Sequence, residues 1–389
     1  MVVFGTRAEA IKLCVLVRRL QSYPESFRVQ TCVTAQHRRM LDQVLATFAV
    51  TPDRDLNLMR ERQTLWDTTA GILTGLGSVL REERPDLVLV QGDTTTAFAA
   101  ALAAFYAGIP VGHVEAGLRT RNRHSPFPEE IHRQFIGRLA DLHFAATARA
   151  AVNLSEEGVP AGRTVVTGNT IVDAMREIRH AIESGQTPRP HWPFLDARKK
   201  LIIATAHRRE SFGAGLQNIC KALALLARRE DVQIVFPVHS NPNVRRAVQG
   251  ALAACPGIEL LEPLEYGSFV DLMTRSYLIL SDSGGIQEEA PGLGKPVLVM
   301  RERTERPEGV EAGVAKLVGT DPEKIVREAC GLLDDPASYS RMTGADNPYG
   351  DGKACDRIVA ALKSYAAGDG DISESGPYAA AHALGWDRS

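Results

Sequence analysis

Carboxylate and histidine side chains repeatedly follow short apolar runs in this sequence. Asp93 follows the run Leu87–Val90, Glu115 ends the run Val111–Val114, and His207 comes after a third run. Acids and bases of these kinds can take a proton from one substrate atom and return it to another. Because the carboxyl ends of parallel strands meet at one edge of a sheet, the spacing favours a functional site there.

A second kind of chemistry is indicated at residues 281–289, which read Ser-Asp-Ser-Gly-Gly-Ile-Gln-Glu-Glu after an apolar run. At such a strand-to-helix junction, unpaired backbone N–H groups and the positive helix end favour an anionic phosphate. The hydroxyl of Ser283 can donate, Gly284 and Gly285 let the backbone approach closely, and Glu289 can accept from ribose hydroxyls. The alternative is an ordinary strand end, where small residues are common.

The remaining candidates each have a structural alternative. Arg7 can pair with a pyrophosphate or be a surface arginine at a helix start, and Asp93 can be only a helix cap. Glu129 and Arg133 are four residues apart, which also fits a surface ion pair. His239 ends another apolar run, and a lone histidine is more often structural than catalytic. The convergence of acids, histidines and arginines at successive strand ends nevertheless favours a functional site.

Apolar runs alternate with helical stretches along the chain, which is typical of parallel sheets covered on both faces. The 389 residues exceed one ordinary core and fit two domains. The predicted strands are 2–4, 29–33, 87–90, 111–114, 143–146, 201–205, 233–237, 258–261, 277–280, 296–300 and 316–318. Residues 164–170 and the amphipathic stretch 171–182 are expected to bridge the domains. We therefore predict an α/β fold with domains 1–175 and 176–365 and a disordered tail, 366–389.

The composition excludes several classes of protein. A formal net charge of −2 gives no support to binding of nucleic acid or an anionic membrane. No apolar stretch approaches the roughly 20 residues that cross a membrane, and the start shows no signal segment. The six cysteines are scattered without a C-x-x-C pair, which predicts buried thiols in a reducing cytoplasm.

A series of motifs runs through the chain. They are Gly5-Thr6-Arg7, Thr34-Ala35-Gln36-His37-Arg38, Gln91-Gly92-Asp93-Thr94-Thr95-Thr96, residues 113–120, Pro128-Glu129-Glu130, Thr167-Gly168-Asn169-Thr170, His207-Arg208-Arg209-Glu210, Pro237-Val238-His239, residues 282–290, Thr304-Glu305-Arg306-Pro307-Glu308 and Asn347-Pro348-Tyr349-Gly350-Asp351-Gly352. Together they closely resemble the bacterial non-hydrolysing UDP-N-acetylglucosamine 2-epimerases over residues 1–365. The resemblance implies two Rossmann-like doubly wound domains in the GT-B arrangement, with the active site in the interdomain cleft and a last helix crossing back to the first domain.

The resemblance also implies a reaction and partners. Members interconvert UDP-N-acetylglucosamine and UDP-N-acetylmannosamine, which supplies ManNAc for surface polysaccharides, and they are usually homodimers. The C2 hydrogen of this sugar has no adjacent carbonyl and is not acidic enough for simple deprotonation and return. By resemblance, UDP leaves C1 while a base removes the C2 proton, and UDP then adds back to 2-acetamidoglucal after protonation of the opposite face. No metal or redox cofactor is implied.

The motif match assigns roles to individual residues. Asp93, Glu115 and Glu129 fall on the acidic catalytic positions of the family, and Arg133 and His207 match others that affect activity. The residues that match the UDP-binding set are Arg7, Phe269, Ser283, Gly284, Gly285 and Glu289. Which carboxylate serves which face of C2 is left open by the motifs.

Some members are activated by UDP-N-acetylglucosamine at a second site. The residues that resemble its lining are Gln36, Arg62, Gln63, Glu129, Arg208 and His239. Arg39 stands where those members tend to have an amide, which leaves the activation open, and Ala8 replaces a helix-start proline with little expected effect. The first strand is a few residues shorter than in the family, so a longer natural N-terminus is expected.

Three alternatives to the reversible epimerase remain. A hydrolysing relative would release UDP and free N-acetylmannosamine through the same intermediate. A GT-B glycosyltransferase is poorly supported by the carboxylates at 93, 115 and 129. A non-catalytic sensor of UDP-sugars is favoured only if those carboxylates prove dispensable.

Overall fold

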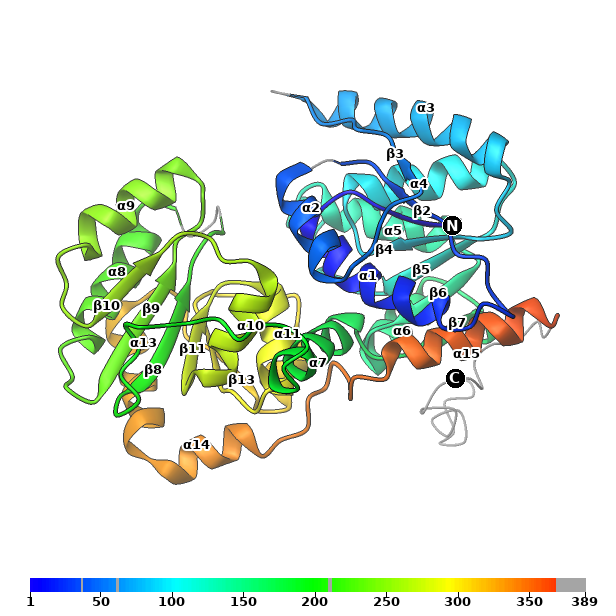
Figure 1. Cartoon of the computed structure of the whole chain (residues 1–389). Coiled ribbons are helices and arrows are strands. Elements are labelled where there is room, and N and C mark those ends of the chain that lie inside the picture. The colour runs from blue at the N-terminus through cyan, green and yellow to red at the C-terminus, as the bar shows by residue number, and fades with distance from the viewer. Residues whose placement is uncertain (36–37, 61–62, 209–211, 369–389) are drawn as a thin grey trace. The chain divides into compact units, whose positions relative to one another are not determined.

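The computed structural model describes residues 1–35, 38–60, 63–208 and 212–368 (Figure 1). The chain forms two compact units. Unit 1 comprises Met1–Ala174 and the segment that begins at Gly350, and unit 2 comprises Met175–Tyr349. Helix α7 (Thr170–Glu183) therefore begins in unit 1 and ends in unit 2.

Unit 1 is built on a seven-stranded sheet in the order β3-β2-β1-β4-β5-β6-β7, in which the neighbours are parallel. Its strands are β1 (Val2–Phe4), β2 (Thr31–Val33), β3 (Arg54–Asp55), β4 (Val88–Gln91), β5 (Val111–Ala116), β6 (Leu142–Ala145) and β7 (Thr164–Val166). Besides part of α7, its helices are α1 (Arg7–Gln21), α2 (Arg38–Thr47), α3 (Leu65–Glu83), α4 (Thr95–Tyr106), α5 (Glu129–Leu139), α6 (Ala148–Glu156), the 3-10 turn η1 (Ala161–Arg163) and α15 (Ala354–Ala366). The strand order reverses between β1 and β4, which is where ligands bind in open sheets of this kind.

Two strands of this sheet are absent from the sequence-based prediction. β3 has only two polar residues, and β7 lies in the segment 164–170 that was expected to bridge the domains. Both lie at the edges of the sheet. Central strands of a parallel sheet are covered on both faces and need a continuous apolar run, whereas edge strands do not. The apolar-run criterion therefore found the central strands and missed both edges.

Threonines set several helix starts in unit 1. The hydroxyl of Thr6 accepts from the backbone N–H of Glu9 at 3.3 Å, and the Glu9 carboxylate accepts from the N–H of Thr6 at 2.7 Å. This reciprocal capping box starts α1. Thr94 caps α4 by accepting from the N–H of Ala97 at 3.0 Å. Because Thr94 is the cap, the interpretation of Asp93 as only a helix cap is wrong.

Helix α15, the last one among the described residues, packs against α1 within unit 1 (Figure 1). Its first N–H groups, those of Ala354 and Cys355, donate to the carboxylate of Asp173 at 3.2 and 2.8 Å. Asp173 belongs to α7, and burial raises the pKa of its carboxyl above the ordinary value. On the other side of the interface, Arg19 Nε donates to Asp356 Oδ1 at 2.5 Å. A carboxylate of α7 thus caps the start of α15.

Unit 2 has a six-stranded parallel sheet in the order β10-β9-β8-β11-β12-β13, which reverses between β8 and β11. Its strands are β8 (Lys200–Thr205), β9 (Val232–Pro237), β10 (Ile258–Leu261), β11 (Leu278–Ser281), β12 (Val297–Val299) and β13 (Ala315–Leu317). Besides part of α7, its helices are α8 (Ala214–Leu226), α9 (Pro242–Leu252), α10 (Tyr266–Arg275), α11 (Gly284–Gly292), α12 (Pro307–Glu311), α13 (Pro322–Asp334) and α14 (Pro336–Thr343). Each of the six strands matches a predicted one to within two residues.

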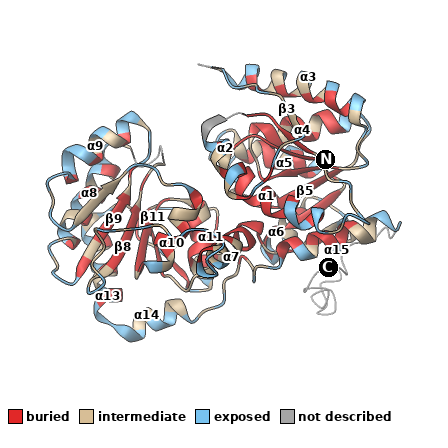
Figure 2. Cartoon of the chain, viewed as in Figure 1, coloured by how far each residue is buried: buried red, intermediate tan, exposed pale blue. Residues whose placement is uncertain are grey.

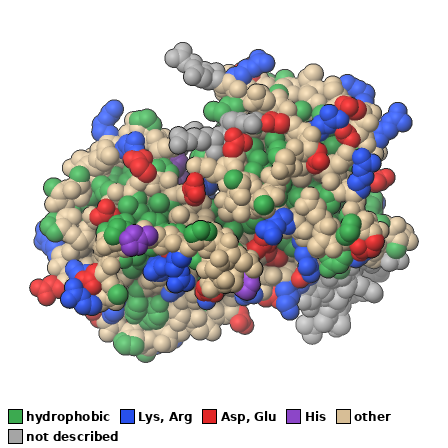
Figure 3. Space-filling model, in the orientation of Figure 1, with side chains coloured by type: hydrophobic (Ala, Val, Ile, Leu, Met, Phe, Trp, Pro, Cys, Tyr) green, Lys and Arg blue, Asp and Glu red, His purple; other side chains and the backbone are tan. Residues whose placement is uncertain are grey.

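The buried residues lie mostly on the strands of the two sheets and on the helix faces that pack against them (Figure 2). The central strands and the inward faces of the helices are buried, as expected for two doubly wound layers. Cys255 and Cys330 are only partly buried, so the prediction that all cysteines are buried is wrong for these two. On the face shown in Figure 3, Lys and Arg side chains are interspersed with Asp and Glu. Among the described residues, no helix is both long and apolar enough to cross a membrane.

Candidate active site

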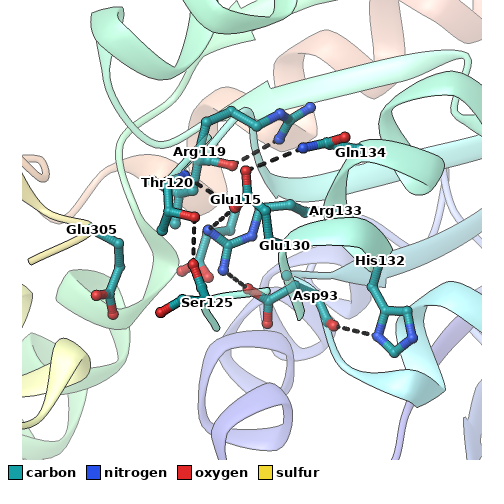
Figure 4. A network of polar contacts seen from close by, with 12 residues as sticks. Asp93, Glu115, Arg119, Thr120, Ser125, Glu130, His132, Arg133, Gln134 and Glu305 are labelled. Atoms are coloured by element: carbon teal, nitrogen blue, oxygen red, sulfur yellow. Dashed lines mark hydrogen bonds and ion pairs between the residues drawn. The ribbon is translucent and has the colours of Figure 1, made fainter. Parts of the chain in front are cut away.

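Asp93 follows β4 at a turn in which Gly92 has a φ of +68°. Its carboxylate accepts a hydrogen bond from Arg133 Nη2 on α5 (Figure 4). The same guanidinium lies 3.3 Å from Glu130 Oε2, and only 5% of the Arg133 side chain is exposed. The surface ion pair proposed for Glu129 and Arg133 is therefore wrong, because Arg133 turns inward to two other acids. Charge-assisted bonds of this kind are strong and geometrically specific.

Glu115 lies in β5, next to β4, and has a φ of +62°. The pairing of β5 with β6 is irregular at this point, with a register shift between Val114 and Ala116. Glu115 Oε2 accepts from Lys12 Nζ on α1 and from Asn169 Nδ2, at 2.6 Å, on the segment after β7. A positive φ at a residue other than glycine persists only where the surroundings hold it, and it is typical of functional sites.

The two carboxylates leave the same edge of the sheet. β4 and β5 are parallel neighbours, and Gln91 is paired in register with Val114. A Cβ atom added to Gly92 would lie 3.4 Å from Glu115 Oε1, so the Glu115 carboxylate packs against the turn that carries Asp93. Unit 1 therefore brings together two acids from adjacent strands, each bound to a cation.

The two consecutive acids of the motif Pro128-Glu129-Glu130 have different surroundings. Glu130 is fully buried and accepts from the backbone N–H groups of Thr120 and Arg121, each at 3.0 Å (Figure 4). It therefore orders the loop after β5. Glu129 is the first residue of α5 and is partly exposed, so it can serve as an acid or base where Glu130 cannot.

The first motif is ordered by a buried carboxylate. Glu9 accepts from the N–H groups of Gly5 and Thr6 at 3.1 and 2.7 Å and from the hydroxyl of Thr94 at 2.5 Å. Burial raises the pKa of Glu9 above its ordinary value, although these hydrogen bonds act in the opposite direction. Arg7, the predicted phosphate-binding residue, is the first residue of α1 and follows this turn directly.

In unit 2, Asp282 organises the end of β8. It accepts from the backbone N–H groups of His207 and Arg208, each at 2.8 Å, and the Nδ1 of His207 lies 3.0 Å from Asp282 Oδ1. Burial opposes ionisation, but the contacts with His207 and the backbone N–H groups lower the pKa of Asp282. The ring of His239 stacks on that of His207 with centroids 5.6 Å apart, and burial lowers the pKa of His239.

The predicted phosphate site is the start of α11. Ser283 precedes the helix, and its side chain makes no cap bond within the described part of the chain. A Cβ atom added to Gly284 would lie 2.5 Å from Arg306 Nη1, so this guanidinium lies against the first turn. The helix start therefore combines its own positive end with an arginine, which suits a phosphate.

Acidic residues hold that arginine. Arg306 Nε donates to Glu288 Oε1 and Nη1 donates to Glu305 Oε1, each at 2.6 Å. Glu305 also accepts from Arg301 at 2.7 Å and from Arg208 at 3.4 Å. Burial opposes its ionisation, but the three arginines lower the pKa of Glu305 below the ordinary value.

The predicted nucleoside-binding residues lie on two neighbouring segments of unit 2. Glu289 is buried on α11, and its Oε1 accepts from the hydroxyl of Tyr266 at 2.7 Å. Phe269 lies one turn after Tyr266 on α10 and is partly exposed. The two predicted residues are thus linked through Tyr266, which the sequence analysis did not single out.

The residues predicted for a second nucleotide-sugar site are only partly described. Gln36 and Arg62 lie outside the described residues, as does the side chain of Arg39. Gln63 Nε2 donates to the carbonyl of Leu58 at 2.7 Å. Within residues 1–35, 38–60, 63–208 and 212–368, no cluster of His, Cys, Asp and Glu is arranged to hold a metal ion.

Comparison with known proteins decides the family. The family described as UDP-N-acetylglucosamine 2-epimerase matches residues 18–363 of the chain. A curated UDP-N-acetylglucosamine 2-epimerase of Salmonella typhimurium is 54% identical over 368 residues, which is 93% of this chain and 98% of the relative. The chain belongs to the UDP-N-acetylglucosamine 2-epimerase family. The resemblance inferred from the motifs is confirmed, and with it the prediction that the protein is an isomerase of this family.

Solved structures agree with this membership. The UDP-GlcNAc 2-epimerase of Neisseria meningitidis, solved bound to UDP-GlcNAc, is 47% identical with a TM-score of 0.88 over 93% of this chain and 98% of that one. A glycotransferase of kitacinnamycin shares the fold alone, at 16% identity and a TM-score of 0.62 over 92% of this chain and 97% of that one. The predicted fold class, two Rossmann-like α/β sheets of the GT-B type, is confirmed.

The sequence analysis assigned no role to four residues that contact predicted site residues, although three of them lie within its motifs and only Lys12 does not. Lys12, Asn169, Asp282 and Arg306 each contact a predicted site residue. Lys12 carries the clearest signal, because it interrupts the apolar stretch Ala-Ile-Lys-Leu on a helix that must face the core. A charge on a buried helix face needs a partner of opposite charge, which the sequence alone does not identify.

Proposed function

We propose that this epimerase interconverts UDP-N-acetylglucosamine and UDP-N-acetylmannosamine without net hydrolysis. The observation that carries the proposal is the pair Asp93 and Glu115, two carboxylates at one sheet edge, held by Arg133 and Lys12 respectively. Removal of a proton from one face of C2 and its return to the other requires two such groups. Glu129, at the start of α5, is the third acid available to this chemistry.

The reaction starts with loss of UDP from C1 as a carboxylate removes the C2 proton. This order avoids a carbanion at a carbon that has no carbonyl neighbour. The products are UDP and 2-acetamidoglucal, and UDP adds back after a proton has reached the opposite face of C2. Because negative charge develops on the departing diphosphate, cations and helix N-termini at that position accelerate the step.

Unit 2 supplies the groups for UDP in this proposal. The start of α11 with Ser283, together with Arg306, suits the diphosphate. Glu289 is proposed for the ribose hydroxyls and Phe269 for the uracil ring. Arg7, at the start of α1 in unit 1, is proposed as a further donor to phosphate, and His207 as a residue that affects turnover.

An isotope experiment tests the mechanism. In deuterated water, the UDP-N-acetylmannosamine formed from UDP-N-acetylglucosamine should carry deuterium at C2, because carboxylates exchange their proton with solvent. Conversion should stop at one equilibrium mixture from either sugar. Product that retains only the original hydrogen would contradict the mechanism. Accumulation of free N-acetylmannosamine would instead identify a hydrolysing enzyme, and transfer of the sugar to an acceptor would identify a glycosyltransferase.

Substitutions test the residue roles. Asp93→Asn, Glu115→Gln and Glu129→Gln should each lower turnover by orders of magnitude, because shape is kept while acid–base capacity is removed. Ser283→Ala and Arg7→Ala should weaken UDP binding, measured by calorimetry, because each removes a donor to phosphate. Full turnover in all three acid variants would show that the acid–base assignment is wrong. Unchanged UDP affinity in both donor variants would move the phosphate site elsewhere.

We also propose that the protein is a homodimer. Large aromatic side chains are exposed on three helices of unit 1, in which α4 packs against both α3 and α5. The exposed fractions are 85% for Trp66 on α3, 58% for Phe105 and 73% for Tyr106 on α4, and 53% for Phe135 on α5. Apolar surface of this kind marks protein interaction sites. Light scattering of the purified protein should give twice the chain mass, and Tyr106→Glu should lower it.

The remaining parts of the proposal concern the setting of the reaction. The scattered cysteines, which form no disulfide among the described residues, support a cytoplasmic enzyme. Its product would supply ManNAc for surface polysaccharides. Activation by UDP-N-acetylglucosamine at a second site would involve Arg208 and His239, which lie on adjacent strand ends. Turnover that rises sigmoidally with substrate, and becomes hyperbolic in Arg208→Ala, would support this regulation.

A further inference from the structure

Two histidines from different elements hold the turn that carries Asp93. The Nε2 of His113 on β5 lies 2.8 Å from the carbonyl oxygen of Gly92. The Nδ1 of His132 on α5 lies 3.0 Å from the carbonyl oxygen of Asp93 itself (Figure 4). Two consecutive carbonyls of one turn are therefore bound by ring nitrogens that arrive from two elements.

The acceptors define the tautomers of both rings. A carbonyl oxygen only accepts, so His113 carries its proton on Nε2 and His132 carries a proton on Nδ1. Burial lowers the pKa of His113 to about 4, which keeps its ring neutral with one donor. Its Nδ1 is buried and has no hydrogen-bond partner among the described residues, as suits the unprotonated nitrogen of a neutral ring.

Each histidine is also adjacent to another group of the site. His113 is two residues before Glu115 in β5, and His132 directly precedes Arg133 in α5. Helix α5 therefore binds Asp93 twice, through its carboxylate and through its carbonyl. The ring of His132 stacks on Phe98, with centroids 5.0 Å apart and planes at 10°, which fixes the direction of its N–H.

We propose that His113 and His132 are positioning residues that set the place of the Asp93 carboxylate by binding the Gly92 and Asp93 carbonyls. The proposal rests on the function of Asp93 as an acid–base group given above. The turn needs such support, because glycine at position 92 leaves the backbone conformationally free and Asp93 is not held by the helix cap that follows it. A displacement of about 1 Å at a reacting group can cost about 100-fold in rate.

Amide substitutions test each hydrogen bond separately. The amide nitrogen of glutamine reaches about as far as Nε2 of histidine, and that of asparagine about as far as Nδ1. At position 113, His113→Gln should therefore keep kcat within about 3-fold of wild type, while His113→Asn lowers it by about 10- to 100-fold. At position 132 the order should reverse, with His132→Asn active and His132→Gln impaired. KM should change by less than about 3-fold throughout, because UDP is bound by other residues.

A matched control is available on the neighbouring strand. His143 on β6 is paired in register with His113, is equally buried, and interacts with the carbonyl of Ala140 rather than with the turn. His143→Asn and His143→Gln should lower thermal stability and leave kcat of the folded enzyme within about 3-fold. A role of His113 in packing alone would make its two variants resemble those of His143.

The outcomes separate cleanly. Opposite amide preferences at 113 and 132 support the proposal, whereas equal kcat for both amides at each position, in folded protein, overturns it. If the variants at 113 do not fold, those at 132 decide. If wild-type enzyme forms no epimer, the proposed function fails, and the turn is then followed by hydrogen exchange of the Gly92 amide, which donates to Val114 at 2.9 Å. His132→Gln should speed that exchange at least 10-fold relative to His132→Asn, and equal rates overturn the proposal.

Discussion

Replacement of Lys12 by methionine should destabilise unit 1 through the acid that it leaves behind. The ammonium of Lys12 and the carboxylate of Glu115 form an ion pair in which 8% and 6% of the side chains are exposed. Methionine keeps most of the volume of lysine and removes the charge. Glu115 then keeps only one of these two partners, the amide of Asn169 at 2.6 Å.

The size of the effect follows from the burial of this pair. Removal of one member of a buried ion pair typically costs about 3–5 kcal/mol, because the other charge stays buried without compensation. We expect a value near the lower end, about 3 kcal/mol, since Asn169 still donates to the same oxygen. For a unit of this size, 1 kcal/mol moves the melting temperature by about 2–4 °C. The unit 1 transition should therefore fall by about 6–12 °C.

Scanning calorimetry on a double-mutant cycle measures this cost. Glu115→Gln alone should also destabilise unit 1, because it leaves the Lys12 charge buried. The double variant carries no buried charge at this pair and should melt above Lys12→Met. The unit 2 transition serves as an internal reference and should not move. A shift below about 3 °C for Lys12→Met, or a double variant no more stable than either single one, would refute the reasoning.

Three further predictions concern stability. Gly117→Ala should abolish folding of unit 1, measured by expression and circular dichroism, because the φ of Gly117 is +89° and a Cβ would lie 2.1 Å from the Ala150 carbonyl oxygen. The control Gly108→Ala, where φ is +67° and no atom lies within 4 Å of the added Cβ, should cost only about 1 kcal/mol. Tyr349→Phe should destabilise unit 2 by about 1–3 kcal/mol, because the Tyr349 hydroxyl donates to the Arg306 carbonyl oxygen at 3.0 Å and accepts from the Gly309 N–H at 2.9 Å. An unchanged melting temperature of unit 2 in calorimetry would contradict this. Burial lowers the pKa of His143 to about 3, below the unfolded value of about 6.5. Its contribution to stability is therefore complete above pH 6.5 and is lost as the pH falls toward 3. His143→Gln should reduce the loss of unit 1 stability between pH 6.5 and 5 by about 2 kcal/mol, and an equal loss in variant and wild type would count against this.

Much of the fold could be predicted because the central strands are buried on both faces. Residues 201–204 and 277–280 are apolar throughout for this reason, and each run corresponds to a strand, β8 and β11. The edge strand β3 could not be predicted, since two polar residues carry no such pattern. The domains 1–175 and 176–365 stay a prediction; by its contacts, the chain leaves unit 1 after Ala174 and returns to it at Gly350.

The candidate site could be predicted only as far as local sequence determines it. Asp93 and Glu115 were found because each follows or ends an apolar run. Their partners could not be found in the same way, since Arg133 is 40 residues from Asp93 and Lys12 is 103 residues from Glu115. Long-range pairs depend on which strand ends and helices meet, and that is a property of the sheet order. The resemblance to a family of known fold supplies the sheet order that the local sequence lacks.

The return of α15 to unit 1 has a consequence for the order in which the two units can fold during synthesis. Unit 1 is split in the sequence, and unit 2 is inserted between its two parts. On the ribosome, all of unit 2 has been synthesised when Tyr349 is added, whereas α1 still lacks the helix that covers it. Chains grow at about 5–20 residues per second, and domains fold as units once they are complete. Unit 2 can thus reach its native structure before unit 1, which is completed only when α15 emerges.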